Sequence, residues 1–391
     1  ELSLQKKGFN YNSSLIPVSI DGSILNGAHR LSAALHLGLD VWTVNTLLPS
    51  ISCNYHYFFK NLVPPDIIEM AVMKILYYAK DSYVAFLWPS GKKNWEKNTE
   101  LFSNIIYKKD ISLTSDGAFN LLFECYYHMD EWVGSKKNNF KGLQKKKVEC
   151  FPTISNVRVI IFQEKRGIDR VKQIKDKIRK NNATGYSSIH ITDTKNEALR
   201  IATWLLNENN LHFLNYSKNF ISRNNKKLTL LEQDIIKDQV SLQDILIDGS
   251  FVLEAYGLRK SNDIDVLVSS SVKSAILKKW ERHDYDFKFH QQKKEDLIYN
   301  PKFYFNLFGF KIISFNQITL FKKTRNEVKD MLDIKLLNQI SKKKTYKMFL
   351  LVFKQRYLYL ILKTRQSLIL IIKKLLKLFR IYPFIKKFIK K

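Results

Sequence analysis

A strand–turn–helix–strand pattern in the second half of the chain constrains the fold most strongly. Residues 245–247 predict the end of a strand, and the glycine-containing turn 248–250 follows it directly. A helix is expected over residues 251–258, and a second strand over residues 263–268. Together with a similar alternation earlier in the chain, this pattern predicts an α/β protein that also contains α+β domains.

Two aspartates begin the second of these strands. Side chains at positions i and i+2 of a strand lie on one face, so Asp263 and Asp265 are expected to lie together. Two carboxylates on one face can bind Mg²⁺ or Mn²⁺, which holds a triphosphate and stabilises in-line phosphoryl displacement. Gly249 allows the backbone to approach the phosphates, and Ser250 offers them a hydroxyl and an N–H group. The sequence therefore predicts a nucleoside triphosphate site in which Asp263 and Asp265 are the catalytic metal ligands.

The arrangement resembles the signature of the DNA polymerase β-type nucleotidyltransferases, in which a hydrophobic residue and Gly-Ser precede a spacer and an alternation of Asp with hydrophobic residues. Twelve residues separate Ser250 from Asp263. The resemblance implies a nucleotidyltransferase-like domain over residues 226–341, with Arg259 and Ser261 as further nucleotide-binding residues. The opposing interpretation is that the two aspartates flank a turn before an ordinary strand.

Residues 309–337 resemble the segment that follows the nucleotidyltransferase core in toxin-like and small-molecule members of that superfamily. The resemblance implies that Lys322 contacts a nucleotide phosphate. The alternative for the two aspartates of this segment is an exposed helix face, on which they pair with neighbouring cations. The positions that match the family segment are Lys322, Arg325, Lys329, Asp330 and Asp333.

A third carboxylate is expected to act as general base for the attacking hydroxyl. Asp286 is the first choice, because it lies with Asp284 on an alternating, strand-like run over residues 283–290. Asp296 is the second choice. If neither serves, the domain binds nucleotide without transferring it.

The first fifty residues predict a smaller strand–helix–strand unit. Residues 15–20 form an extended run that ends at the turn 21–22, and a second strand is expected over residues 41–44. The helix between them is expected over residues 27–37, where Gly38 ends it.

Gly27, His29 and Arg30 lie at the start of this helix. Free backbone N–H groups at a helix N-terminus face anions, and an arginine adds a bidentate contact, so these residues form a candidate phosphate site. The competing interpretation is a solvated surface. Residues 14–46 resemble the phosphate-binding box of the ParB/sulfiredoxin-like fold, and the resemblance implies phosphate or nucleotide binding by these three residues.

The box departs from its relatives at two positions. Ala28 stands where sulfiredoxins need a reactive cysteine, which excludes sulfiredoxin chemistry. Asn26 stands where small-molecule kinases of the fold have aspartate, although Asp21 is close by in the turn. A kinase that uses His29 and Arg30 is therefore an alternative function. Because residue 1 is Glu, the domain is expected to be truncated at its N-terminus.

Residues 51–225 match no family signature, and their pattern predicts a middle α/β region. His190 and Asp193 form a possible second site, because ligands often bind at the ends of strands in α/β units. In the structural alternative, His190 is a packed side chain without a functional role. The negative charge of Asp193 then interacts favourably with the N-terminal end of the helix dipole, and Thr194 caps the helix. The predicted elements are helices at 64–80, 168–180 and 195–207, strands at 157–162, 187–191 and 211–215, and an exposed linker at 134–149.

The last fifty residues are strongly basic. The formal net charge of the chain is +29, and residues 342–391 contain sixteen Lys and Arg without Asp or Glu. Their apolar runs reach about six residues, whereas a spanning helix needs about twenty. Basic residues among Leu, Ile, Phe and Tyr at helical spacing instead predict an amphipathic tail that binds an anionic membrane through residues 345–391. A nucleic-acid-binding tail and a helical hairpin packed on the catalytic domain are the alternatives, and the apolar content makes nucleic acid the less favoured partner.

These features predict domains at residues 1–50, 51–225, 226–341 and 342–391. The favoured function is Mg²⁺-dependent nucleotidyl transfer to a small-molecule or glycan acceptor, in bacterial surface-polysaccharide biosynthesis. A ParB-fold kinase, a toxin-like nucleotidyltransferase acting on RNA or protein, and a non-catalytic nucleotide-binding scaffold are the alternatives. Three scattered cysteines favour a reducing compartment, so the protein is expected in the cytoplasm, on the inner face of the membrane.

Overall fold

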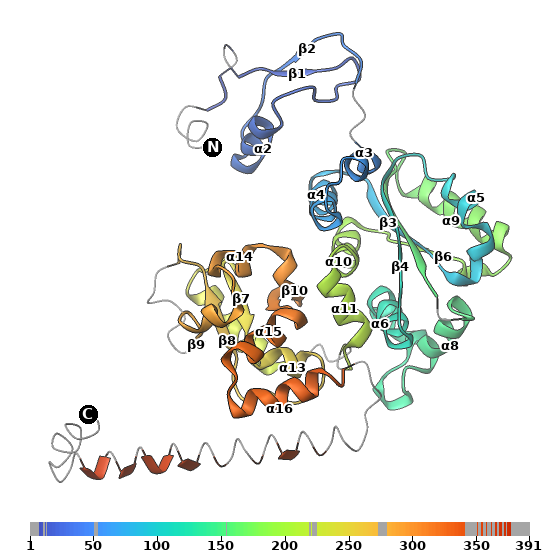
Figure 1. Cartoon of the computed structure of the whole chain (residues 1–391). Coiled ribbons are helices and arrows are strands. Elements are labelled where there is room, and N and C mark those ends of the chain that lie inside the picture. Colours follow the sequence, from blue (N-terminus) through green and yellow to red (C-terminus); the bar gives the residue numbers. More distant parts are fainter. Residues whose placement is uncertain are drawn as a thin grey trace. The chain divides into compact units, whose positions relative to one another are not determined.

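The computed structural model has a mixed α/β fold with several small sheets, which confirms the predicted class at this level (Figure 1). The structure describes residues 8–10, 12, 14–50, 54–153, 155–218, 220, 225–272 and 280–340, and scattered residues between 350 and 376. It divides into two compact units, Glu1–Ile68 and Glu69–Lys391.

The first unit contains the predicted strand–helix–strand motif. Strands β1 (Ile16–Val18) and β2 (Thr43–Asn45) pair in parallel, and helix α2 (Ala28–Leu37) connects them. Gly27 and Gly38 flank the helix with φ angles of 86° and 66°, a left-handed conformation that glycine adopts without strain. Helix α3 (Tyr55–Lys60) follows, and α4 (Pro65–Tyr78) confirms the helix predicted at 64–80.

The middle sheet lies in the second unit. It consists of β3 (Ser82–Leu87), β4 (Ile105–Ile111), β5 (Val157–Gln163) and β6 (Ile189–Ile191), in the order β4-β5-β3-β6 with antiparallel neighbours. The strands predicted at 157–162 and 187–191 are confirmed as β5 and β6. Strand β3, which the sequence analysis did not predict, lies between them.

Helices cover both faces of this sheet (Figure 1). Apolar side chains of α5 (Trp95–Thr99) and α9 (Ile168–Asn182) form a core with one face, including Trp95, Val171 and Ile174. Helix α10 (Lys195–Leu205) packs near β3 on the other side. Helices α6 (Ser115–Tyr126) and α7 (Asp130–Val133) precede β5.

The prediction of an exposed linker at residues 134–149 is wrong. A 3₁₀ turn (Lys136–Asn138) and helix α8 (Lys141–Cys150) occupy this segment. Leu143 and Cys150 are fully buried, because residues seven apart lie on one face of a helix. The run of lysines hid this pattern, because Lys146 and Lys147 lie on either side of the buried face and Lys145 is exposed.

The strand predicted at 211–215 is also wrong, because helix α11 (Glu208–Tyr216) covers these residues. The side chain of Asn207 caps the helix by accepting hydrogen bonds from the N–H groups of Asn209 and Asn210. Phe213 and Leu214 are buried on one face.

The third sheet contains the strand–turn–helix–strand segment that constrains the fold most strongly. Its order is β10-β11-β7-β8-β9, where β7 pairs antiparallel with β8 and parallel with β11. The side chain of Asn210 in α11 exchanges hydrogen bonds with the backbone of Asn306, which joins this sheet to the middle region. The strands are β7 (Ile245–Asp248), β8 (Asp265–Val268), β9 (Glu281–Arg282), β10 (Tyr304–Leu307) and β11 (Phe310–Ile313).

The helices of this region are interspersed with the strands along the chain. Helix α13 is shorter than the predicted 251–258, and β8 begins at Asp265 rather than at residue 263. The helices are α12 (Lys226–Lys237), α13 (Phe251–Ala255), α14 (Lys294–Tyr299), α15 (Phe315–Arg325) and α16 (Val328–Leu337).

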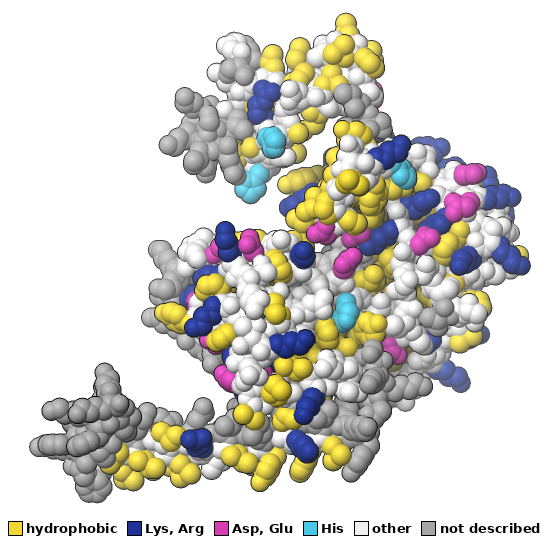
Figure 2. Space-filling model, in the orientation of Figure 1, with side chains coloured by type: hydrophobic (Ala, Val, Ile, Leu, Met, Phe, Trp, Pro, Cys, Tyr) yellow, Lys and Arg dark blue, Asp and Glu magenta, His cyan; other side chains and the backbone are white. Residues whose placement is uncertain are grey.

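The described residues of the C-terminal tail are helical. Exposed apolar side chains recur among them at helical spacing, including Phe353, Tyr357, Ile361 and Leu368 (Figure 2). Within the described residues, no helix has the length and apolar character needed to cross a membrane. Pro383, where the sequence predicts a break in the tail helix because proline cannot continue a helix, lies outside the described residues.

Candidate functional site

The Gly249 turn brings the end of β7 against the start of β8. Asp248, the last residue of β7, pairs in register with Asp265, the first residue of β8. Gly249 has a φ of 67°, and a Cβ atom there would lie 1.8 Å from Oδ2 of Asp265. Only glycine therefore permits this approach of backbone and carboxylate. Ser250 follows at the N-terminus of α13, and within the described chain its side chain makes no capping hydrogen bond.

Asp263 and Asp265 differ in their surroundings. Asp265 is buried, with 8% of its surface exposed. Asp263 is exposed and precedes the strand. The prediction that both lie on one strand is therefore wrong, because the ladder between β7 and β8 ends where the chain turns at Gly249.

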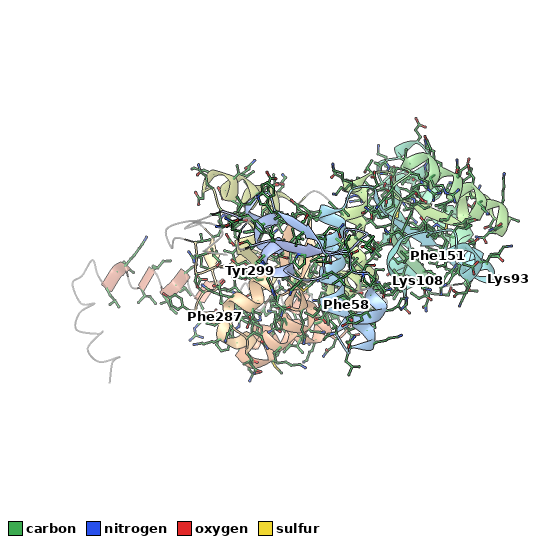
Figure 3. All side chains as sticks on the ribbon, turned by 90° about the horizontal axis from the view of Figure 1, so that it is seen from above. Phe58, Lys93, Lys108, Phe151, Phe287 and Tyr299 are labelled. Carbon is green, nitrogen blue, oxygen red and sulfur yellow. The ribbon has the colours of Figure 1, made fainter. Side chains whose placement is uncertain are left out.

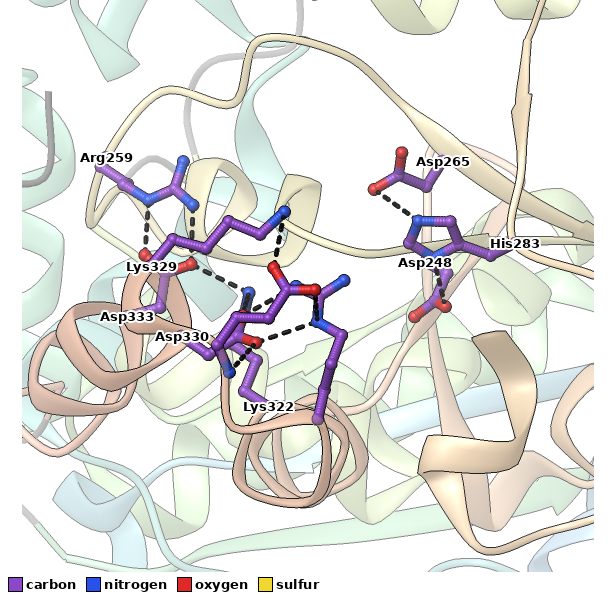
Figure 4. A network of polar contacts seen from close by, with 10 residues as sticks. Asp248, Arg259, Asp265, His283, Lys322, Lys329, Asp330 and Asp333 are labelled. Carbon is purple, nitrogen blue, oxygen red and sulfur yellow. Dashed lines mark hydrogen bonds and ion pairs between the residues drawn. The ribbon is translucent and has the colours of Figure 1, made fainter. Parts of the chain in front are cut away.

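Two buried histidines, neither of which was predicted as a site residue, complete this end of the sheet. Nδ1 of His283 lies 3.1 Å from Oδ2 of Asp248, and Nε2 of His290 lies 3.0 Å from the same oxygen. Nε2 of His283 lies 3.5 Å from Oδ2 of Asp265. Figure 4 shows His283 between the two carboxylates. The sequence does contain a signal for these site residues, since histidines stand at both ends of the run 283–290.

The carboxylates determine the charge of His283. Burial by itself lowers the pKa of His283, but the hydrogen bond to Asp248 and the charges of Asp248, Asp265 and Asp286 outweigh it and raise the pKa to about 9. Burial opposes ionisation of Asp248, yet His290 and His283 hold its pKa well below the usual range. Near neutral pH an imidazolium therefore lies beside Asp265.

The predicted phosphate-binding cations take part in a buried ionic network (Figure 4). Nζ of Lys322 lies 3.1 Å from Oδ1 of Asp330 and 2.9 Å from Oδ2 of Asp333. Arg259 donates two hydrogen bonds of 2.7 Å to the carboxylate of Asp333. Arg325 donates two more to Asp330. In this structure Lys322 and Arg259 therefore join α15, α16 and the segment before β8.

The alternative of an exposed helix face for Asp330 and Asp333 is wrong. Both carboxylates are buried. Burial raises their pKa values, but hydrogen bonds from Arg325 to Asp330 and from Arg259 to Asp333, together with Lys322, lower both below the usual range. Both side chains are therefore ionised and hold the network together. Lys329 pairs with Glu327 at the exposed edge.

Ser261 stabilises the loop before β8. Its N–H and hydroxyl both donate to Oε2 of Glu254, at 2.8 Å and 2.7 Å. Nζ of Lys227 donates to the Ser261 hydroxyl at 2.8 Å. Ser261 thus links the loop to α12 and α13, and it is buried.

No described strand contains the expected third carboxylate, so the strand-like interpretation of residues 283–290 is wrong. Strand β9 ends at Arg282, and Asp286 begins a 3₁₀ helix, Asp286–His290, which includes Phe287 (Figure 3). Asp286 still influences the site, since its charge raises the pKa of His283. Asp284 pairs with Arg282 and Lys294. Asp296 is exposed in α14.

The carboxylates of Asp263 and Asp265 fit the ligand preference of Mg²⁺. Among the described residues, no group of three or more His, Cys, Asp or Glu side chains is arranged to hold a metal ion. Mg²⁺ commonly binds through one or two carboxylates, with water and substrate phosphates as its other ligands. The two aspartates supply this kind of donor set, and Asp265 lies against the Gly249 turn.

In the first unit, Arg30 lies over Gly27. Nη1 of Arg30 donates a hydrogen bond of 3.1 Å to the carbonyl oxygen of Leu15. Nη2 lies 3.1 Å from the position that a Cβ atom would take on Gly27. His29 is exposed at the same helix start. The structure thus keeps Gly27 and Arg30 together.

Asp21 belongs to the turn after β1. Its Oδ1 atom accepts hydrogen bonds from the hydroxyl of Ser19 at 2.6 Å and from the N–H of Ser23 at 3.0 Å. These bonds hold the pKa of Asp21 well below its usual range. The carboxylate therefore stabilises the turn in this structure.

His190 and Asp193 lie at the end of β6 and contact different partners. Nε2 of His190 lies 3.2 Å from Oε1 of Glu197. Asp193 pairs with Lys175 at 2.6 Å, and its N–H donates to Glu197. Thr194 caps α10 as expected, accepting from the N–H of Glu197. Burial lowers the pKa of His190, although Glu197 opposes this shift.

Comparison with known proteins gave no match: no family model, curated protein or solved structure matches this chain. Its function must therefore be inferred from the motifs and from the geometry described above.

Proposed function

We propose that this chain is a Mg²⁺-dependent nucleotidyltransferase of the DNA polymerase β type, which transfers a nucleotidyl group to a hydroxyl of a small-molecule or glycan acceptor. One observation supports this most strongly: the Gly249 turn, at φ 67°, lies directly against the Asp265 carboxylate. A backbone that can approach phosphates is thereby adjacent to a carboxylate that can hold their counter-ion.

In this proposal Asp263 and Asp265 hold the ion, which supplies positive charge to the triphosphate when it is bound. Gly249 and Ser250 bind the phosphates through backbone N–H groups and the Ser250 hydroxyl. The acceptor oxygen forms a bond to the α-phosphorus as the bond to the pyrophosphate oxygen breaks, and pyrophosphate leaves. The acceptor proton passes to a carboxylate, for which Asp286 is the proposed base because its charge acts on His283 in the same site.

His283 has a positioning role in this scheme. Its imidazolium lies 3.5 Å from Asp265 and 3.1 Å from Asp248. A fixed cation between two buried carboxylates reduces their mutual repulsion and orients Asp265 toward the turn.

The C-terminal tail is the basis for proposing where the reaction takes place. Residues 342–391 contain sixteen basic residues and no acidic one, which favours an anionic membrane surface. A glycan or lipid-linked acceptor on the cytoplasmic side of a bacterial membrane suits an enzyme placed there, as in surface-polysaccharide biosynthesis.

The transfer is tested with ATP and CTP labelled at either the α- or the γ-phosphorus, with Mg²⁺ and a cell extract as the source of acceptor. The expected result is α-label in a product of the wild type, with at least about a hundredfold loss in Asp263→Asn and Asp265→Asn. Transfer of γ-label that survives both substitutions would instead identify a kinase centred on His29 and Arg30. Label on RNA or protein would identify the toxin-like alternative, and nucleotide binding without transfer would identify a scaffold.

A pair of glycine variants tests the turn itself. Gly249→Ala is expected to abolish transfer, because its Cβ would lie 1.8 Å from Asp265. Gly309→Ala is the matched control: Gly309 has a φ of 86°, but within the described structure nothing lies within 4 Å of its Cβ position. Both variants incur backbone strain, about 1 kcal/mol or more, so equal activities in the two would contradict the proposal.

A further inference from the structure

A cavity lies in the middle region, at the end of β6. Its volume is about 430 Å³, within the range of small-molecule sites. It is formed where α6, α7, α8 and α9 converge on the strand. The side chains used below are Tyr126, Trp132, Lys146, Arg179, Tyr186 and His190.

Lys146 brings an amine to the wall of this cavity. Its Nζ atom donates to the backbone carbonyl of Tyr186 at 2.8 Å and to the hydroxyl of Ser187 at 3.3 Å. Both partners are neutral, and the Ser187 hydroxyl in turn donates a hydrogen bond of 2.9 Å to the carboxylate of Glu149, whose charge acts on Lys146. Burial lowers the pKa of Lys146. An ammonium has three N–H donors, so one remains available to an anion.

Two further cations line the cavity, and their charges are partly balanced. Arg179 pairs with Asp176 at 3.0 Å and stacks on the Tyr186 ring, with 4.5 Å between guanidinium carbon and ring centroid. Lys175 pairs with Asp193 at 2.6 Å. Asp193 is the single carboxylate among the described lining residues, against three cations. The cavity is therefore suited to an anion.

Aromatic side chains form the rest of the wall. Tyr126 contacts His190 and Trp132, with ring centroids 5.1 Å and 5.2 Å apart. Trp132 is 39% exposed and Tyr186 is 75% exposed, so both rings have surface to offer a ligand. Burial favours the neutral form of His190, which therefore adds a polar ring without adding charge.

We infer that this cavity binds a small organic phosphate that carries one flat ring. The phosphate pairs with Lys146 and Arg179, because an ammonium and a guanidinium together match a dianion. The ring packs on Trp132 and Tyr186. This site is independent of the proposed nucleotidyl transfer, since none of its residues belongs to the Gly249 turn or the Asp265 cluster.

Calorimetric titration of the full chain tests the inference, with phenyl phosphate as the probe and with inorganic phosphate and phenol as its separate halves. Phenyl phosphate is expected to bind saturably and more tightly than either half. Lys146→Met is expected to weaken phenyl phosphate by at least about tenfold, the effect of losing a charged hydrogen bond. Trp132→Ala is expected to weaken phenyl phosphate while leaving inorganic phosphate unchanged.

Lys145→Met is the matched control, because Lys145 is exposed on the same helix. It loses the same charge and is expected to bind phenyl phosphate like the wild type. Circular dichroism confirms that each variant is folded, and Arg179→Gln replaces Lys146→Met if that variant unfolds. Three results would overturn the inference: no saturable binding, equal losses in Lys145→Met and Lys146→Met, or loss of binding in Asp265→Asn, which would place the probe in the other site.

Discussion

The charge on His283 depends on its neighbours more than on its burial. A buried imidazole without partners is neutral near pH 7, but His283 lies between Asp248 and Asp265. Lys322 is likewise buried, and its Nζ atom contacts the carboxylates of Asp330 and Asp333. In both places a residue that looks like a free functional group in the sequence is partnered by buried carboxylates in the fold.

A pH-dependent contribution to stability follows from the raised pKa of His283. The folded pKa of about 9 lies above the ordinary value of 6.5, so the contribution is complete below about pH 6.5 and is lost as the pH rises through about 9. His283→Gln is expected to remove it, a pH-dependent difference of about 3 kcal/mol in the free energy of unfolding.

Urea unfolding of wild type and His283→Gln over this pH range measures that difference. His56→Gln, at an exposed position, is the control and is expected to show no such pH-dependent difference. A gap between wild type and His283→Gln that stays constant with pH would show that folding does not shift the pKa of His283.

Helix α8 illustrates how an element can be hidden by its composition. Lys145, Lys146 and Lys147 suggest a solvated loop, but Leu143 and Cys150 form a buried face seven residues apart. Gly142 lets the helix approach α7, since a Cβ there would lie 1.6 Å from the carbonyl oxygen of Trp132. The element is decided by two buried side chains and one close backbone contact.

A pair of truncations on α8 tests this description. Leu143→Ala is expected to destabilise the protein by about 2–5 kcal/mol, because it leaves a cavity at a fully buried position. Val148→Ala, at a position 68% exposed on the same helix, is expected to change the free energy of unfolding by less than about 0.5 kcal/mol. Thermal or urea unfolding measures both, and similar values for the two would mean that the segment is an exposed linker after all.

For the whole molecule, the uneven distribution of charge is the dominant feature. The tail contributes +16 of the net +29, so the other 341 residues contribute +13. The described tail residues are helical, with exposed apolar side chains among exposed cations. This combination favours an anionic bilayer surface, where apolar burial and charge attraction act together.

Removal of three tail charges is expected to weaken binding to phosphatidylglycerol vesicles. The variant Lys354→Gln/Arg365→Gln/Lys374→Gln loses about 1 kcal/mol per charge, so its partition coefficient is expected to fall by about a hundredfold. Co-sedimentation of the full chain with the vesicles measures this. Lys93→Gln/Lys177→Gln/Lys237→Gln removes three exposed charges from elsewhere in the chain and is expected to have little effect; equal losses in both variants would contradict a membrane role for the tail.

The sequence by itself determined the local path of the chain at both candidate phosphate sites. Apolar runs interrupted by glycine specified β1, α2 and β2, and likewise β7 and the turn into α13, because these patterns depend on residues close together in the sequence. The tertiary structure decided which side chains meet: His283 and His290 reach Asp248 from 35 and 42 residues away, and Arg259 reaches Asp333 from 74. Such pairs depend on how whole elements pack, which local periodicity does not encode.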